Sequence, residues 1–122
     1  MGWREHRYAP ALGTRLCRVD SVPGGACKEL RYGDGDEALS LLVYRGALGI
    51  RIYVNKCPHF SLPLNARPDK FLLLKDAQIM CAHHCAVFRL DDGHCIAGPA
   101  AGFALEPVAV TVVDEHVYLD SQ

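Results

Sequence analysis

Short apolar segments alternate with polar turns along most of the chain. Segments rich in Val, Leu, Ile and Tyr are interrupted by Gly, Asp and Asn about every ten residues, which is typical of an all-β antiparallel sandwich or barrel. Near the C-terminus Val108, Val110 and Val112 alternate with Ala109 and Thr111, which predicts a strand with one buried face. No window combines a sustained 3.6-residue period with helix caps, so we expect little or no helix.

The predicted strands are Arg15–Val19, Leu39–Tyr44, Ile50–Asn55, Phe71–Lys75, Gln78–Met80, Val87–Leu90, His94–Ala97, Val108–Val113 and Val117–Leu119. Hairpin turns are expected at Asp91-Asp92-Gly93 and Asp114-Glu115. We also expect Phe71–Leu74 and Ala77–Met80 to form a hairpin. Residues 1–10 have the sequence of a loosely held arm.

Length and charge narrow the class of protein. At 122 residues we expect one domain over residues 1–122. The net charge of −1 argues against a nucleic-acid partner, because neutralising phosphates needs a basic surplus. No run of about 18 apolar residues suits a membrane span. Met1–Arg7 mixes charges and lacks the apolar stretch of a secretory signal, so a cytoplasmic location is expected.

Six cysteines could indicate a disulfide framework. Without a secretory signal, reduced thiols and metal ligands are the better interpretation. Cys17 and Cys27 lie in or beside apolar segments and are interpreted as small packed thiols.

The strongest motif is Cys57-Pro58-His59 followed by Cys81-Ala82-His83-His84. Thiolates suit iron–sulfur clusters and zinc, and imidazoles suit iron and zinc. Each loop offers one thiolate and an imidazole, as needed if one iron takes both thiolates and a second iron takes both imidazoles. Tetrahedral zinc with two Cys and two His is the alternative, although zinc sites usually pair cysteines within one loop.

The stretch from Asn55-Lys56-Cys57-Pro58-His59 through Gly98-Pro99-Ala100-Ala101-Gly102 resembles the cluster-binding half of a Rieske [2Fe–2S] protein. Phe88–Gly93 resembles the hairpin of that family, and Gly98-Pro99 resembles the proline loop that covers its cluster. The likeness extends over residues 12–119. It implies a Rieske-type antiparallel fold with a smaller cluster-binding part at about 55–102.

The resemblance also implies a ligand set for one [2Fe–2S] cluster. Cys57 and Cys81 would hold one iron, and His59 and His84 would hold the other. Spacing alone leaves His83 open as a ligand, because Cys81-x-His83 copies the first loop; the family pattern selects His84. Cys85 stands where these proteins commonly carry Gly, so a positive φ there would strain the backbone.

Several residues around the loops differ from high-potential family members. By the resemblance, Leu62 and His83 correspond to the positions of an interloop disulfide, and Ala86 and Phe88 correspond to positions that carry a Ser and a Tyr hydroxyl. Because hydrogen bonds to cluster sulfurs raise the potential, their loss predicts a value of roughly −150 mV.

Apolar residues of the loops suggest a contact surface. We expect an apolar collar around the exposed imidazoles, where redox partners dock over a small area. Its residues would be Pro58, Phe60, Leu62, Leu64, Pro99 and Ala100.

The functional hypothesis is a one-electron carrier that passes electrons from a flavin reductase to a terminal oxygenase or similar redox enzyme through transient contacts. It would perform no bond chemistry by itself, because no nucleophile–base signature is present and the chain has no room for the mononuclear iron domain of an oxygenase. Two alternatives remain: a small accessory subunit of a larger reductase such as nitrite reductase, and a zinc-stabilised interaction module.

Overall fold

The computed structural model describes residues 3–58, 62–67, 70–83 and 85–120. Its regular secondary structure is almost entirely antiparallel strands, which confirms the predicted all-β class. The turns η1 (Trp3–Glu5), η2 (Val19–Ser21) and η3 (Gly35–Glu37) are single 3₁₀ turns, and these described ranges contain no α-helix. Accordingly, no helix in the described part of the chain has the length and apolarity to cross a membrane.

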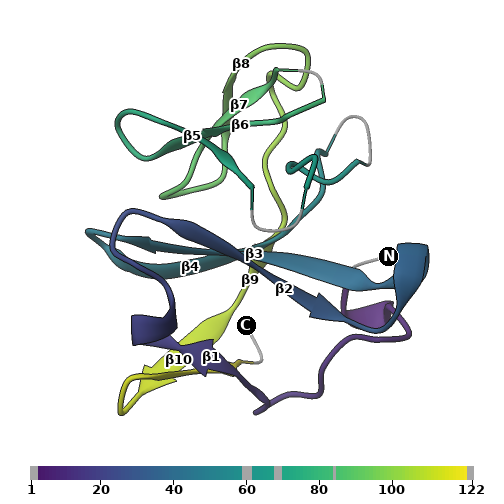
Figure 1. Cartoon of the computed structure of the whole chain (residues 1–122), viewed down its shortest axis with the longest axis vertical. Coiled ribbons are helices and arrows are strands. Elements are labelled where there is room, and N and C mark those ends of the chain that lie inside the picture. Colours follow the sequence, from purple (N-terminus) through teal and green to yellow (C-terminus); the bar gives the residue numbers. More distant parts are fainter. Residues whose placement is uncertain (1–2, 59–61, 68–69, 84, 121–122) are drawn as a thin grey trace.

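The strands form three sheets (Figure 1). The first has the order β1-β11-β10 and consists of β1 (Arg15–Arg18), β10 (Val110–Val113) and β11 (His116–Leu119). The second has the order β2-β3-β4-β9 and consists of β2 (Cys27–Tyr32), β3 (Leu39–Gly46), β4 (Gly49–Val54) and β9 (Pro107–Val108). The third has the order β5-β6-β7-β8 and consists of β5 (Leu72–Leu74), β6 (Gln78–Met80), β7 (Val87–Arg89) and β8 (Cys95–Ala97).

The middle sheet separates two hydrophobic cores, with the first sheet on one side and the third on the other (Figure 1). Along β3, Leu41 and Val43 enter the core shared with the first sheet, whereas Leu42 and Tyr44 enter the other. Because alternate side chains of a strand point to opposite faces, a strand buried on both faces reads as the continuous apolar run seen here. The second core, on the side of β5–β8, contains the two cysteines of the predicted metal site.

The predicted hairpins are confirmed. β5 and β6 pair through Leu73 and Ile79, and β7 and β8 pair across the turn that contains Gly93. β10 and β11 are joined at Asp114-Glu115, where both residues have positive φ, 51° and 67°. Two-residue hairpins need this left-handed geometry to match strand twist.

Strand β2 is missing from the sequence prediction. It pairs with β3 over its whole length, from Cys27 opposite Tyr44 to Tyr32 opposite Leu39. Its sequence, Cys-Lys-Glu-Leu-Arg-Tyr, carries three charged residues, so the apolar signal for a strand is weak. The strand forms because it pairs with β3 over its whole length at the edge of the sheet, where Arg31 reaches solvent and the buried Glu29 side chain is held by hydrogen bonds.

The single strand predicted over Val108–Val113 is wrong. The chain forms β9, which pairs with β4, and then β10, which pairs with β11. The break at Ala109 lets the chain leave one sheet for the next. Val108 is buried, but Val112 is 47% exposed, so the expected buried face does not continue along the segment.

The loosely held arm expected at residues 1–10 is also wrong for the described residues 3–10. Trp3 is 7% exposed and belongs to the first core, while Tyr8 and Ala9 pack against it. Arg4 donates a hydrogen bond to the carbonyl of Asp120. The indole supplies enough apolar area to hold a segment whose other residues are mostly polar.

Candidate metal centre

The two cysteines of the motif lie on loops supplied by different sheets. Cys57 follows the end of β4, and Cys81 follows β6 in the loop that leads to β7. Both are completely buried and belong to the same core. His59 and His84, the predicted imidazole ligands, lie outside the described residues.

Backbone hydrogen bonds close each loop around its cysteine. The Cys57 amide donates to the carbonyl of Leu62 at 2.7 Å, and the Cys81 amide donates to the carbonyl of Ala86 at 2.7 Å. A further bond, from the Ala82 amide to the carbonyl of Leu64 at 2.8 Å, ties the second loop to the first. The loops are therefore held to each other as well as to their own strands.

Both thiols suit metal ligation. All six cysteines are free, so neither Cys57 nor Cys81 is consumed by a disulfide. They are enclosed by apolar side chains that exclude water, such as Leu64 and Phe88. No group of three or more Cys, His, Asp and Glu gathers among the described residues, which omit His59 and His84. The two thiols fit the thiolate half of a [2Fe–2S] site.

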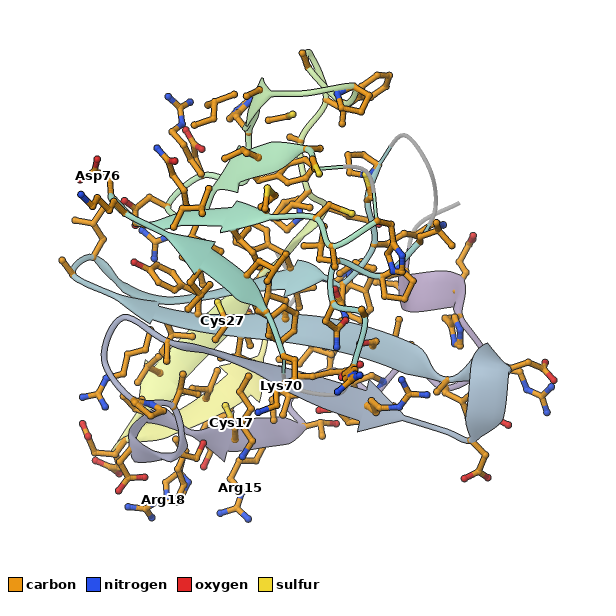
Figure 2. All side chains as sticks on the ribbon, turned by 45° about the horizontal axis from the view of Figure 1, so that its top comes forward. Arg15, Cys17, Arg18, Cys27, Lys70 and Asp76 are labelled. Carbon is orange, nitrogen blue, oxygen red and sulfur yellow. The ribbon has the colours of Figure 1, made fainter. Side chains whose placement is uncertain are left out.

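Cys17, Cys27 and Cys95 lie outside the two loops that carry the cysteines of the motif. Cys17 packs beside the first core and Cys27 beside the second, in agreement with their interpretation as packed thiols. Burial raises the pKa of Cys27 to about 12, which leaves the thiol protonated at neutral pH. In Figure 2 Cys17 lies in the lower part of the molecule, where Arg15 and Arg18 of β1 point outward, and Cys27 lies nearer its middle. Cys95 donates to the carbonyl of Ala97.

Cys85 has a positive φ, the case in which its side chain strains the backbone. Its φ is +59°, in the left-handed region that favours glycine, and its side chain is exposed. The strained conformation leaves the hydrogen bonding of the loop intact, since the Cys85 amide still donates to the carbonyl of Cys81 at 3.1 Å.

This strain leads to a measurable prediction. The Cys85→Gly variant is expected to be about 1 kcal/mol more stable than Cys85→Ala, because alanine removes the thiol but retains the Cβ that disfavours positive φ. Thermal unfolding of both variants under anaerobic conditions measures the difference. Equal midpoints would show that the backbone at this position carries no strain.

The segment after β8 packs against the second cysteine loop. Gly98 has φ of +93°, and a Cβ built on it would lie 2.8 Å from the Cα of Ala86. Ala100 is completely buried beneath the turn, and the Ala101 amide donates to the carbonyl of Gly98. The Gly98-Pro99 turn therefore lies against the backbone of the Cys81 loop, as the resemblance implied.

The buried surroundings of the cysteines contain few hydroxyl donors. Ala86 and Phe88 are both completely buried and carry no hydroxyl. The Tyr53 hydroxyl belongs to the same core but donates to the carbonyl of Leu90 at 2.7 Å. Burial raises the pKa of Tyr53 to about 12, so this donor stays protonated in its bond to Leu90.

The expected apolar collar is only partly present at the surface. Leu62 is 39% exposed and Pro99 is exposed, whereas Phe60 lies outside the described residues. Leu64 and Ala100 are completely buried, so they are core residues and the prediction that they form a contact rim is wrong. Both side chains fill space beneath the loops. The sequence shows only that these residues are apolar, and an apolar residue can lie in a core or on a contact surface.

A buried polar cluster beside the first loop is absent from the sequence prediction. Asn55 and Asn65 flank the loop and are 4% and 7% exposed. They hydrogen-bond to each other and to residues of β2 and β3. In the sequence, the only sign of this cluster is a pair of asparagines on either side of an apolar loop. Side-chain amides tolerate burial only when they are hydrogen-bonded, so two buried asparagines close together indicate a polar cluster.

Comparisons with known proteins agree with this geometry. The Rieske [2Fe-2S] domain family matches residues 14–115. Among curated protein sequences no match was found. Among solved structures, the ferredoxin of carbazole 1,9a-dioxygenase from Nocardioides aromaticivorans IC177 is 18% identical, with a TM-score of 0.68 over 92% of this chain and 100% of that chain.

Two further solved structures have the same fold. The Sphingomonas yanoikuyae B1 ferredoxin is 24% identical, with a TM-score of 0.66 over 90% of this chain and 99% of that one. A terminal oxygenase of carbazole 1,9a-dioxygenase, also from N. aromaticivorans IC177, is 16% identical with a TM-score of 0.70; the match covers 89% of this chain and 30% of the oxygenase chain. The domain thus occurs both alone and within larger chains.

The antiparallel sheets and the paired loops define a β protein with two buried, unlinked thiols in one core. The chain belongs to the Rieske [2Fe-2S] domain family. Its cofactor is a Rieske-type [2Fe–2S] cluster.

Proposed function

We propose that this protein is a one-electron carrier whose [2Fe–2S] cluster is held by Cys57, Cys81, His59 and His84. The observation that supports this most directly is the pair of buried, unlinked thiols on two mutually hydrogen-bonded loops. When bound, the cluster accepts and releases one electron. The chain's own residues exclude water from the thiols and fix the two loops relative to each other.

The proposal includes the direction of electron flow. Ferredoxins of oxygenase systems share this fold over nearly their full length, and one matched chain comes from a complex of reduced oxygenase and oxidized ferredoxin. A flavin reductase is proposed as donor and a terminal oxygenase as acceptor. Leu62, Pro99 and Phe103 expose apolar surface on the loops and the turn beside them, which suits small and transient contacts.

A low reduction potential is part of the same proposal. The buried side chains of Ala86 and Phe88 offer no hydrogen bond to a cluster sulfur, and Tyr53 donates to Leu90 instead. We therefore expect a midpoint potential of roughly −150 mV. A midpoint above zero in an anaerobic redox titration would contradict this part of the proposal.

Purified protein and one pair of variants test the ligand set. Wild-type protein isolated anaerobically is expected to contain iron and sulfide in equal amounts and to give a rhombic EPR signal on reduction. Cys81→Ser is expected to lose the signal, because serine does not supply the thiolate that the iron requires. Cys27→Ser is the matched control, since Cys27 packs against the same core but is assigned no ligand role.

The outcomes separate the alternatives. A full cluster in Cys81→Ser would contradict the ligand set, and a colourless wild-type protein containing zinc would contradict the carrier role. The oxidised protein is expected to accept one electron at a time from a flavin reductase, and the reduced protein to pass it to a terminal oxygenase, without forming a complex that survives gel filtration. Stable co-purification with a larger reductase would instead indicate an accessory subunit.

A further inference from the structure

A buried carboxylate lies among the polar residues beside the first cysteine loop. Glu29 of β2 has a side chain only 5% exposed. Its Oε1 accepts a hydrogen bond from the Asn65 amide at 3.0 Å, and its Oε2 accepts one from the Ser40 hydroxyl at 2.6 Å. The half-exposed Arg31 guanidinium lies 3.3 Å from Oε2. The carboxylate therefore acts only as an acceptor.

The two asparagines extend this arrangement to the ligand loop. Asn65 accepts a hydrogen bond from the Asn55 amide at 2.7 Å, and Asn55 accepts one from the backbone amide of Leu64 at 2.9 Å. The second hydrogen of each amide is also used: Asn55 donates to Ser40 at 3.0 Å, and Asn65 donates to the carbonyl of Arg67 at 2.8 Å. Every side-chain donor of both asparagines is satisfied, which fixes their orientation.

The path continues to the second loop. The carbonyl of Leu64 accepts the amide of Ala82, the residue after Cys81. A continuous series of hydrogen bonds thus runs from β2, through both asparagines, to the two loops that carry the cysteines. Glu29 determines which groups donate and which accept along this series. A carboxylate can only accept, so Asn65 directs its N–H groups toward β2 and its carbonyl toward Asn55.

We propose that Glu29 is a positioning residue for the iron–sulfur site, acting through Asn65, Asn55 and Leu64 to fix both cysteine loops. This inference rests on the proposed ligand set. Glu29 lies in a strand remote in sequence from either loop, and its hydrogen bonds lead to the loops through Asn65 and Asn55. Its role is to keep the loops in the geometry that retains the cluster.

The test replaces the carboxylate by its isosteric amide. Glu29→Gln conserves shape but can present a donor to the Asn65 amide, which is itself a donor. In the holoprotein, the rate of cluster loss to an anaerobic iron chelator is expected to rise about tenfold. The EPR signal of the reduced cluster is expected to broaden. Amide hydrogen exchange at Leu64 and Ala82 should accelerate, while the Leu119 amide, bonded to Thr14 in the other core region, should not change.

Two comparison variants make the result specific. Glu37→Gln applies the same chemical change to an exposed glutamate paired with Arg7 and is expected to leave cluster loss unchanged. The double variant E29Q/N65D exchanges donor and acceptor across the pair, so the introduced glutamine amide can donate to the introduced carboxylate. It is expected to recover at least half of the lost cluster lifetime, although the bond to the Arg67 carbonyl and the ion pair with the half-exposed Arg31 are lost.

Each outcome decides the question. A normal cluster in wild type with an unchanged loss rate in E29Q would overturn the positioning role and leave the proposed function intact. Absence of a [2Fe–2S] cluster from wild type would overturn the proposed function itself. If E29Q yields no folded protein, recovery of cluster-loaded protein by E29Q/N65D supports the role, and failure of the double variant overturns it.

Discussion

Phe88→Ala is expected to lower the free energy of unfolding by about 4 kcal/mol, the range found when a buried aromatic ring is deleted from a packed core. Phe88 lies on β7 opposite Ile79 of β6, and it is completely buried. Its ring belongs to the same core as Cys57 and Cys81. Removing the ring therefore opens a cavity in the core that contains both cysteines of the proposed metal site, and it weakens the third sheet.

Anaerobic thermal unfolding measures this loss, and the midpoint is expected to fall by about 15 °C for a chain of this size. The cluster should also be lost faster to a chelator, because the loops rest on the damaged core. Phe103→Ala is the matched control: the same ring is 48% exposed there, so only a small change is expected. A Phe88→Ala midpoint equal to that of Phe103→Ala would show that the second core does not support the domain.

Much of the fold follows from local patterns. The apolar run at Leu39–Tyr44 predicts a buried strand, and Asp114-Glu115 predicts a hairpin whose two positive φ values the structure contains. The polar strand β2 could not be predicted this way, because Lys28, Glu29 and Arg31 give no apolar periodicity. Its existence depends on pairing with β3, which is a property of the assembled sheet.

The candidate site likewise has a part that the sequence predicts and a part that depends on the folded sheet. The sequence motif predicts Cys57 and Cys81 as ligands, and the structure places both in one buried core. The ligand roles of Cys57, Cys81, His59 and His84 stay predictions. The support given by Glu29 could not be predicted from any local window. Its bond to Asn65 spans 36 positions of sequence, and only the folded sheet brings a charged edge-strand residue beneath the ligand loop.

Gly98→Ala is expected to destabilise the domain by about 3 kcal/mol through two separate effects. Alanine disfavours the φ of +93°, at a cost of about 1 kcal/mol. Its Cβ would also lie 2.8 Å from the Ala86 Cα and 3.1 Å from the Cys85 carbonyl oxygen, both of which are backbone atoms that cannot rotate away. Overpacking of this kind typically costs 1–3 kcal/mol, so we assign it about 2 kcal/mol.

Gly102→Ala separates these effects. Gly102 has nearly the same φ, +92°, but a Cβ there would meet no atom within 4 Å. Gly102→Ala should therefore show only the backbone cost, and the difference between the two variants measures the close approach of the Gly98 turn to the Cys81 loop. Cluster loss should accelerate in Gly98→Ala alone, because only there must the loop that holds Cys81 and Ala86 move. Equal unfolding midpoints and equal cluster lifetimes in the two variants would mean that the turn covers the loop without packing against it.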